Sequence, residues 1–219
     1  MQPRYPLLFW DLDGTLTDPK EGITKSVQYA LLRLGIPAPD LDRLTPFIGP
    51  PLLTSFQEFY GLDLATAEQA VRYYRERFEQ DGIFENKVFP EIPPLLAELR
   101  QSGVRMAVAT SKPLPLALRI LDHFDLKGYF AGVYGADLTG QVSRKRDVLA
   151  LAIHDLTDAE RALAAMIGDH PVDIEAARYH GLAAIAVLYG YGDPERLLEA
   201  SPQGVAAHVA DLRRLLYLS

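Results

Sequence analysis

The chain has 219 residues, of which 48% are hydrophobic, and its formal net charge is −7. This length suits one large domain or one domain with a small insert, and an acidic chain is a poor candidate for binding nucleic acid or an anionic membrane. The sequence contains no cysteine, which excludes disulfides, thiolate metal sites and a cysteine nucleophile. We find neither a signal-peptide pattern nor an apolar run near the ~18 residues that cross a bilayer, so we expect a cytoplasmic protein.

The first predicted element is a buried strand over residues 7–10, which leads into residues 11–15 (DLDGT). Four consecutive apolar residues are typical of a buried strand and too few for a helix. The carboxylates of Asp11 and Asp13, just past this strand, are costly to bury unless something pairs with them. A metal ion and a phosphate-handling role would offset that cost. An ordinary Asp-Gly turn at the end of the strand is the structural alternative.

Residues 18–86 are predicted to form an all-helical insert. Asp18 is expected to cap a helix that begins at Pro19, with Glu21 completing a capping box, and Gly35 is expected to end it. No strand signal of comparable strength follows within the insert. Further helical stretches are predicted over residues 40–48, 51–60 and 64–81.

From residue 87 onward, predicted strands and helices alternate. This alternation favours a Rossmann-like α/β fold, in which a parallel sheet has helices on both faces. We therefore assign residues 1–17 and 87–219 to one catalytic core and residues 18–86 to the insert. The strands are expected at 104–109, 133–136, 164–167 and 184–188. Helices are expected at 92–101, 143–154, 171–180 and 209–216, and a further helix that includes Ala117, Ile120, Leu121 and Phe124 is expected after residue 113.

Three of the predicted strands end in polar residues, namely Asp11 with Asp13, Thr110, and Asp169. Ligands of such sheets bind beyond the carboxyl ends of the strands, so we expect these residues to share one site. Asp173, at the start of the next predicted helix, can face the same space.

These residues suit phosphate chemistry. Carboxylates ~4 Å apart repel by ~4 kcal/mol per pair at an effective dielectric constant of about 20, so several together require a cation. Oxygen ligands without a cysteine or histidine cluster favour Mg²⁺ over zinc. Of Asp11 and Asp13, one would attack phosphorus to form an aspartyl phosphate, and the other would give a proton to the leaving oxygen and later take one from water. Thr110 and Lys145 would hold the phosphoryl oxygens.

Over its whole length the chain resembles the haloacid dehalogenase superfamily of aspartate-dependent phosphatases. Residues 11–15, 109–113 (ATSKP), 143–146 (SRKR) and 168–173 (GDHPVD) look like its four motifs, in the family order. The resemblance implies that Asp11 is the nucleophile and Asp13 the general acid and base.

The resemblance also implies a Mg²⁺ cofactor. Its ligands would be Asp169, the Asp11 carboxylate and the main-chain carbonyl of Asp13, with Asp173 either a further ligand or a group behind the ligands. Lys145 would bind phosphate, although Arg144 or Arg146 beside it could supply the cation instead. The implied substrate contacts are Thr110, Ser111, Lys145 and Gly14, whereas Lys112 is expected to order its loop or to lie in solvent.

Within the superfamily, residues 18–31 and 49–52 (GPPL) look most like the phosphoglycolate phosphatase group and its 5'-nucleotidase-like branch. The insert would then be the small helical cap that closes over the site in that family. Gly49 and Pro50 are candidate substrate contacts in this cap. The implied partner is a small phosphorylated metabolite, and the enzyme would be a monomer or a homodimer.

Two alternatives remain. A phosphosugar mutase would share all four motifs, and a non-catalytic phosphometabolite-binding module would keep the fold. Such a module would typically have lost Asp11 or Asp13, and this chain has both. A carbon–halogen dehalogenase of the same superfamily lacks the second acid of the first motif, so Asp13 argues against it.

Overall fold

The computed structural model describes residues 2–137 and 142–218 of the chain. It contains two compact units, of which the first joins Met1–Asp18 to Val88–Ser219 and the second is Pro19–Lys87. The first unit is an α/β structure and the second is built from helices, so the predicted fold class is confirmed.

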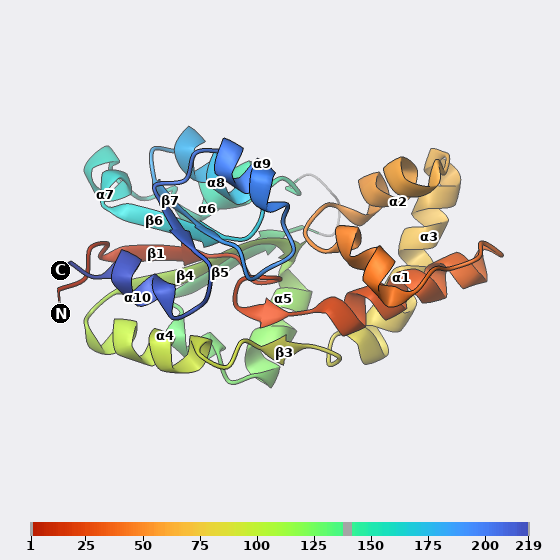
Figure 1. Cartoon of the computed structure of the whole chain (residues 1–219), viewed down its shortest axis with the longest axis horizontal. Helices are drawn as coiled ribbons and strands as arrows, with labels where there is room; N and C mark the ends of the chain where they lie inside the picture. Colours follow the sequence, from red (N-terminus) through yellow and green to blue (C-terminus); the bar gives the residue numbers. More distant parts are fainter. Residues whose placement is uncertain (1, 138–141, 219) are drawn as a thin grey trace. The chain divides into compact units, whose positions relative to one another are not determined.

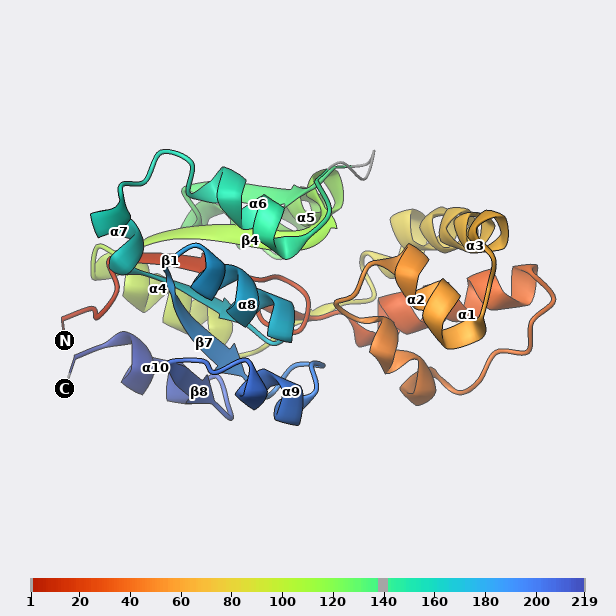
Figure 2. The same ribbon diagram turned by 90° about the horizontal axis from the view of Figure 1, so that it is seen from above.

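The α/β unit is organised around a six-stranded sheet with the strand order β5-β4-β1-β6-β7-β8, in which neighbouring strands run parallel. Strand β1 lies in the middle, where Leu7 is in register with Arg105 of β4 and with Ala164 of β6. Figure 2 shows these strands from above. Their bounds are β1 Leu7–Trp10, β4 Arg105–Pro113, β5 Gly132–Ala136, β6 Ala164–Gly168, β7 Ala183–Val187 and β8 Gly204–Ala206.

Helices cover both faces of this sheet, with α6 and α8 on one side and α4 and α10 on the other (Figure 1). Within the described residues, no helix of either unit is both long enough and apolar enough to cross a membrane. The helices of the α/β unit are α4 Ile92–Gln101, α5 Leu114–His123, η3 Lys127–Tyr129, α6 Lys145–Ala152, α7 Asp158–Ala162, α8 Pro171–Tyr179, α9 Pro194–Glu199 and α10 Asp211–Leu216.

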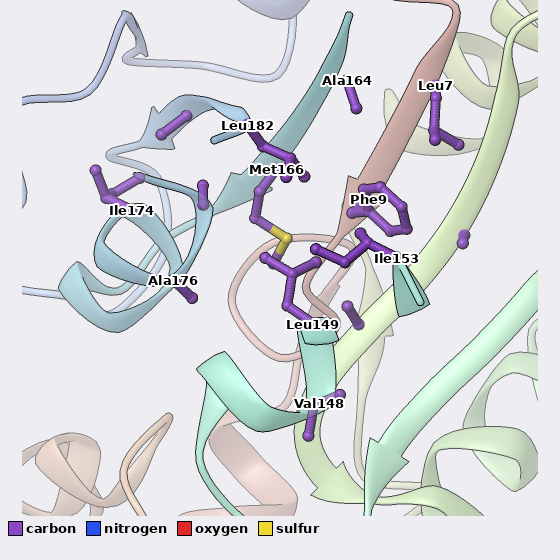
Figure 3. Close-up of a cluster of buried hydrophobic side chains, with 14 of the residues drawn as sticks. Leu7, Phe9, Val148, Leu149, Ile153, Ala164, Met166, Ile174, Ala176 and Leu182 are labelled. Carbon is purple, nitrogen blue, oxygen red and sulfur yellow. The ribbon is translucent and has the colours of Figure 1, made fainter. Parts of the chain in front are cut away.

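One hydrophobic cluster fixes the sheet against α6 and α8 (Figure 3). Phe9 of β1 and Met166 of β6 pack with Leu149 of α6, with Ile153 just after that helix and with Ile174 of α8, and none of these side chains is more than 1% exposed. Burying a side chain of this size stabilises the fold by ~1.5–3 kcal/mol. The cluster therefore holds in place the strand ends and helix starts that carry the predicted site residues.

The helical unit has its own core, which includes Val27, Leu31, Phe56 and Phe78, each at most 2% exposed. The two-stranded sheet of β2 Thr17–Asp18 and β3 Lys87–Val88 is formed where the chain passes from one unit to the other. The helices of the helical unit are α1 Lys20–Arg33, the 3₁₀ helix η1 Leu41–Phe47, α2 Leu52–Tyr60, α3 Leu64–Arg77 and the π-helix η2 Phe78–Gly82.

The predicted helix cap at Asp18 is wrong. Helix α1 begins at Lys20, and no side chain makes a capping hydrogen bond there. Asp18 lies in β2, and its carboxylate accepts a hydrogen bond from the Tyr191 hydroxyl. The carboxylate of Asp18 therefore bonds to a residue distant in sequence and does not cap the helix that follows it.

Candidate active site

The carboxyl ends of three neighbouring strands place the predicted site residues at one edge of the sheet. Trp10, the last residue of β1, is in register with Val108 of β4 and with Ile167 of β6. The chain of β1 continues along β6 for one more residue, because the Asp11 N–H donates to the Ile167 carbonyl at 2.9 Å. Asp11 therefore emerges at the edge where β6 ends and Asp169 follows.

Asp11, Asp169 and Asp173 form a buried cluster. Each offers one carboxylate oxygen, and these oxygens lie within 4.8 Å of one another. The three residues are 6%, 3% and 0% exposed. Oxygen donors of this kind suit a hard divalent cation, so the cluster could hold a metal ion.

Lys145 lies against two of these carboxylates. Its Nζ is 2.6 Å from Asp11 Oδ1 and 2.8 Å from Asp173 Oδ1, and it also donates to the Ala109 carbonyl at 3.0 Å. Arg144 and Arg146, its neighbours in sequence, are both exposed. The structure thus brings Lys145, and neither flanking arginine, to the carboxylates.

Burial and an excess of negative charge shift the pKa values of the cluster. Burial, reinforced by the carboxylates of Asp11 and Asp173, raises the pKa of Asp169 to about 8. Burial also raises the pKa of Asp173, an effect that Lys145 partly offsets. Burial disfavours the charged form of Lys145, but Asp11 and Asp173 outweigh it and raise the pKa of that amine. One fixed cation therefore faces three carboxylates, and further positive charge would relieve their repulsion.

Asp169 is held by two groups to which the sequence analysis gave no role. The Thr15 hydroxyl donates to Asp169 Oδ1 at 3.1 Å, and the Tyr191 N–H donates to Oδ2 at 2.8 Å. Gly14 has a φ of 82°, and a Cβ there would lie 2.1 Å from Asp169 Oδ2, so only glycine permits this approach. Tyr191 could have been noticed, because residues 189–192 (YGYG) follow a strand of the same sheet.

Asp13 stands apart from this cluster. Its Oδ2 is 2.6 Å from the Nζ of Lys112, whose side chain is only 6% exposed. The predicted position of Lys112 in solvent is therefore wrong, and the alternative, that it orders its loop, agrees with this contact. Thr110 is 2% exposed and Ser111 beside it is half-buried.

Gly49 and Pro50, the two remaining predicted contacts, lie between η1 and α2 in the helical unit. Nothing in the unit's internal packing shows what they bind, so their contact with substrate stays a prediction. The same holds for the main-chain carbonyl of Asp13 as a metal ligand.

The sequence model of the haloacid dehalogenase-like hydrolases matches residues 8–187, and the chain belongs to this family. A crystal structure of a predicted phosphatase from Clostridium acetobutylicum superposes with a TM-score of 0.91 at 43% identity, over 96% of this chain and 97% of that one. The family predicted from the four motifs is confirmed.

Curated relatives cover nearly the whole chain. A 5'-nucleotidase of Pseudomonas aeruginosa is 47% identical over 97% of this chain and 96% of its own length. The tyrosine-protein kinase PtkA of Mycobacterium tuberculosis is 39% identical over 95% of this chain and 70% of its own length. A phosphoglycolate phosphatase of Pseudomonas syringae pv. syringae is 31% identical over 96% and 78%. With the family and the solved structure, the 5'-nucleotidase and the phosphoglycolate phosphatase among these relatives show that the chain is an enzyme of the phosphatase class.

Proposed function

We propose that this chain is a Mg²⁺-dependent phosphomonoesterase that works through a phosphorylated Asp11. The observation that supports this most directly is the group of three buried carboxylates, Asp11, Asp169 and Asp173, around the single amine of Lys145. A fold has no structural need for so much buried negative charge, and titratable groups with strongly shifted pKa values concentrate at functional sites.

The residues present fit the proposed cofactor. Asp11, Asp169 and Asp173 would hold Mg²⁺ through their carboxylate oxygens. The pKa of Asp169 is raised by burial and by the neighbouring carboxylates, whose negative charge a divalent cation would neutralise. When bound, Mg²⁺ would supply positive charge that lets an anionic nucleophile approach an anionic phosphoryl group.

In the proposed reaction, a carboxylate oxygen of Asp11 attacks phosphorus, and the bond from phosphorus to the leaving oxygen breaks. Asp13 gives a proton to that oxygen, which departs as an alcohol. Asp13 then takes a proton from water as the water oxygen attacks the aspartyl phosphate. The bond from phosphorus to Asp11 breaks, which releases inorganic phosphate and restores the free carboxylate. Lys145 and Thr110 would hold the phosphoryl oxygens throughout.

The proposed substrate is a small phosphorylated metabolite, either phosphoglycolate or a nucleoside 5'-monophosphate. This choice is supported by the names of two relatives, a 5'-nucleotidase and a phosphoglycolate phosphatase. We further propose that the helical unit acts as the family's cap and selects the substrate, with Gly49 and Pro50 as its candidate contacts.

The direct test is the release of inorganic phosphate from phosphoglycolate, nucleoside 5'-monophosphates, pyrophosphate and hexose phosphates, each with Mg²⁺ and with EDTA. We expect release that requires Mg²⁺, with a preference for one of the first two classes. A hexose phosphate that is isomerised without phosphate release would indicate a mutase instead. Ligand binding without any turnover would indicate a binding module.

The variant Asp11→Asn tests the nucleophile. Loss of the attacking carboxylate should lower kcat by at least about 10⁴-fold while the circular dichroism spectrum is retained. Rapid quenching with labelled substrate should trap a phosphoryl group on the wild-type protein and none on the variant. Asp122→Asn is the matched control, because Asp122 is 57% exposed and pairs with Lys127 at the surface. Near wild-type phosphate release by Asp11→Asn would remove Asp11 from this role.

A further inference from the structure

Strand β4 carries an irregularity beside the candidate site. Its pairing with β5 passes from Thr110–Gly135 directly to Pro113–Ala136, so the register between the two strands shifts at Ser111 and Lys112. The Lys112 N–H donates instead to the Thr110 hydroxyl, at 3.2 Å. Bulges of this kind bend a strand and redirect a side chain, and they are frequent beside active sites.

The redirected side chain of Lys112 reaches Asp13. Lys112 Nζ lies 2.6 Å from Asp13 Oδ2, and the two side chains are 6% and 12% exposed. A buried ion pair is screened little by water, and removing one partner leaves the other charge uncompensated. Lys112 therefore fixes the position of one oxygen of the Asp13 carboxylate.

The other oxygen of Asp13 is in a different state. Asp13 Oδ1 is buried, and it has no hydrogen-bond partner in the part of the chain that the structure describes. Most buried polar atoms are hydrogen-bonded, so an exception calls for an explanation, and a catalytic role is one. The two oxygens of Asp13 thus have separate surroundings, one engaged by a cation and one left open.

We propose that Lys112 is a positioning residue for Asp13. By holding Oδ2, Lys112 keeps the carboxyl group in one orientation, in which Oδ1 faces the oxygen that leaves phosphorus. The inference rests on the proposed function, in which Asp13 exchanges protons with the reacting oxygens. In this role Lys112 acts through Asp13 and not through the phosphoryl group.

Two substrates with different leaving groups distinguish a misplaced proton donor from a general loss of structure, because a general loss of structure would lower activity on both. An alkoxide must be protonated as it departs, whereas p-nitrophenolate departs without a proton. We expect Lys112→Met to lower kcat/KM about 10- to 100-fold for an alkyl phosphate such as phosphoglycolate, within the range of general acid catalysis. For p-nitrophenyl phosphate the loss should be below about 5-fold, because misplacing the proton donor matters little there.

A double-mutant cycle with Asp13→Asn, measured on p-nitrophenyl phosphate and on the alkyl phosphate, separates the two ways in which a lysine could act. If Lys112 works through Asp13, adding Lys112→Met to Asp13→Asn should lower kcat/KM by less than about 2-fold. If Lys112 instead binds the phosphoryl group, Lys112→Met should lower kcat/KM by the same factor in the Asp13→Asn protein as in the wild-type protein. Lys112→Arg, which retains the cation, should recover part of the alkyl phosphate activity.

Lys127→Met is the matched control for the loss of a lysine, since Lys127 is 50% exposed and pairs with the exposed Asp122 at the surface. This control should leave kcat/KM unchanged for both substrates. Equal losses of kcat/KM on the two substrates for a folded Lys112→Met would overturn the inference while leaving the phosphatase function intact. A wild-type protein that released phosphate from neither substrate would instead contradict the proposed function.

Discussion

Lys145 shows how one residue can balance a site from which water is excluded. Its amine touches Asp11 and Asp173, and its side chain is 2% exposed. Without this amine the three carboxylates of the cluster would face one another with no cation between them. Lys145 and a bound metal ion would therefore share the same task of neutralising charge.

This sharing predicts the behaviour of Lys145→Met. In EDTA the variant should lose about 3 kcal/mol of unfolding free energy, because a buried ion pair has lost one partner. Added Mg²⁺ should raise its melting temperature more than it raises that of the wild-type protein, since the cation then meets no competing amine. Thermal unfolding with EDTA and with saturating Mg²⁺ measures both effects. A smaller Mg²⁺ shift in the variant than in the wild type would contradict this account.

The sequence predicted the residues of the cluster better than the residues that hold them. Asp11, Asp169 and Asp173 follow recognisable strands and stand in a known motif order. Thr15 and Lys112 depend on the exact course of a loop and of a bulge, and neither leaves a periodic signal. Spacing along the chain therefore pointed to the three acids of the cluster, but it did not separate Asp13 from them or identify the donors that orient them.

At the scale of elements, the loop at residues 189–192 is a structural support for Asp169 and the candidate metal site. Tyr191 donates its N–H to Asp169, and the Tyr189 hydroxyl donates to the Thr15 carbonyl at 3.0 Å. Gly190 lies so close that a Cβ there would be 2.4 Å from both Cβ and Oδ2 of Asp169. The loop and the carboxylate can therefore occupy this space only if residue 190 has no side chain.

Gly190→Ala should accordingly displace Asp169. We expect a loss of about 1–3 kcal/mol in unfolding free energy from overpacking. The Mg²⁺-induced rise in melting temperature should fall with it, because a displaced ligand binds the cation less well. Gly128→Ala is the matched control, since a Cβ at Gly128 would meet nothing within 4 Å. A variant with a wild-type Mg²⁺ shift would show that the loop does not support the site.

The elements that the sequence analysis missed are short. The helix expected at residues 92–101 occurs as α4 Ile92–Gln101, because ten residues carry a clear helical period. Helix α7, helix α9 and strand β8 were missed, and they contain 5, 6 and 3 residues. Strand β4 extends to Pro113, four residues beyond the expected end, because its last residues pair past the bulge.

At the scale of the whole molecule, the helical unit is a compact unit that is stabilised by contacts of its own. In the helical unit, Glu85 ties the end of the segment to its beginning. Its carboxylate accepts from Arg77 at 2.8 Å and from Lys25 at 3.0 Å, and its carbonyl accepts from the Gly22 N–H at 2.9 Å. The hydrogen bonds from Arg77 lower the pKa of Glu85, a shift that burial opposes and Lys25 reinforces.

Because the pKa of Glu85 is lower in the folded state than in the unfolded state, its contribution to the unfolding free energy depends on pH. The stabilisation is fully present above the unfolded pKa of about 4.3 and is lost as the pH falls through the folded value. Glu85→Gln should therefore reduce the unfolding free energy by about 1 kcal/mol near neutral pH, a difference that should shrink in acid.

Urea unfolding of both proteins at about pH 7 and about pH 3 measures that difference. Glu68→Gln is the control, because Glu68 is an exposed residue of α3. It should show no such change with pH. A destabilisation of Glu85→Gln that was equal at both pH values would mean that the charge of Glu85 contributes nothing.

The central place of β1 has a consequence for the synthesis of the protein. Both partners of β1 come after the helical unit in sequence, since Leu7 pairs with Arg105 and with Ala164. On the ribosome, the apolar residues of β1 emerge well before either partner exists, whereas the helical unit can form its more local contacts at once. The nascent chain must therefore keep this strand from aggregating until β4 and β6 have been translated. The strand that leads into Asp11 is made before every other strand of the sheet, and it is buried only when they arrive.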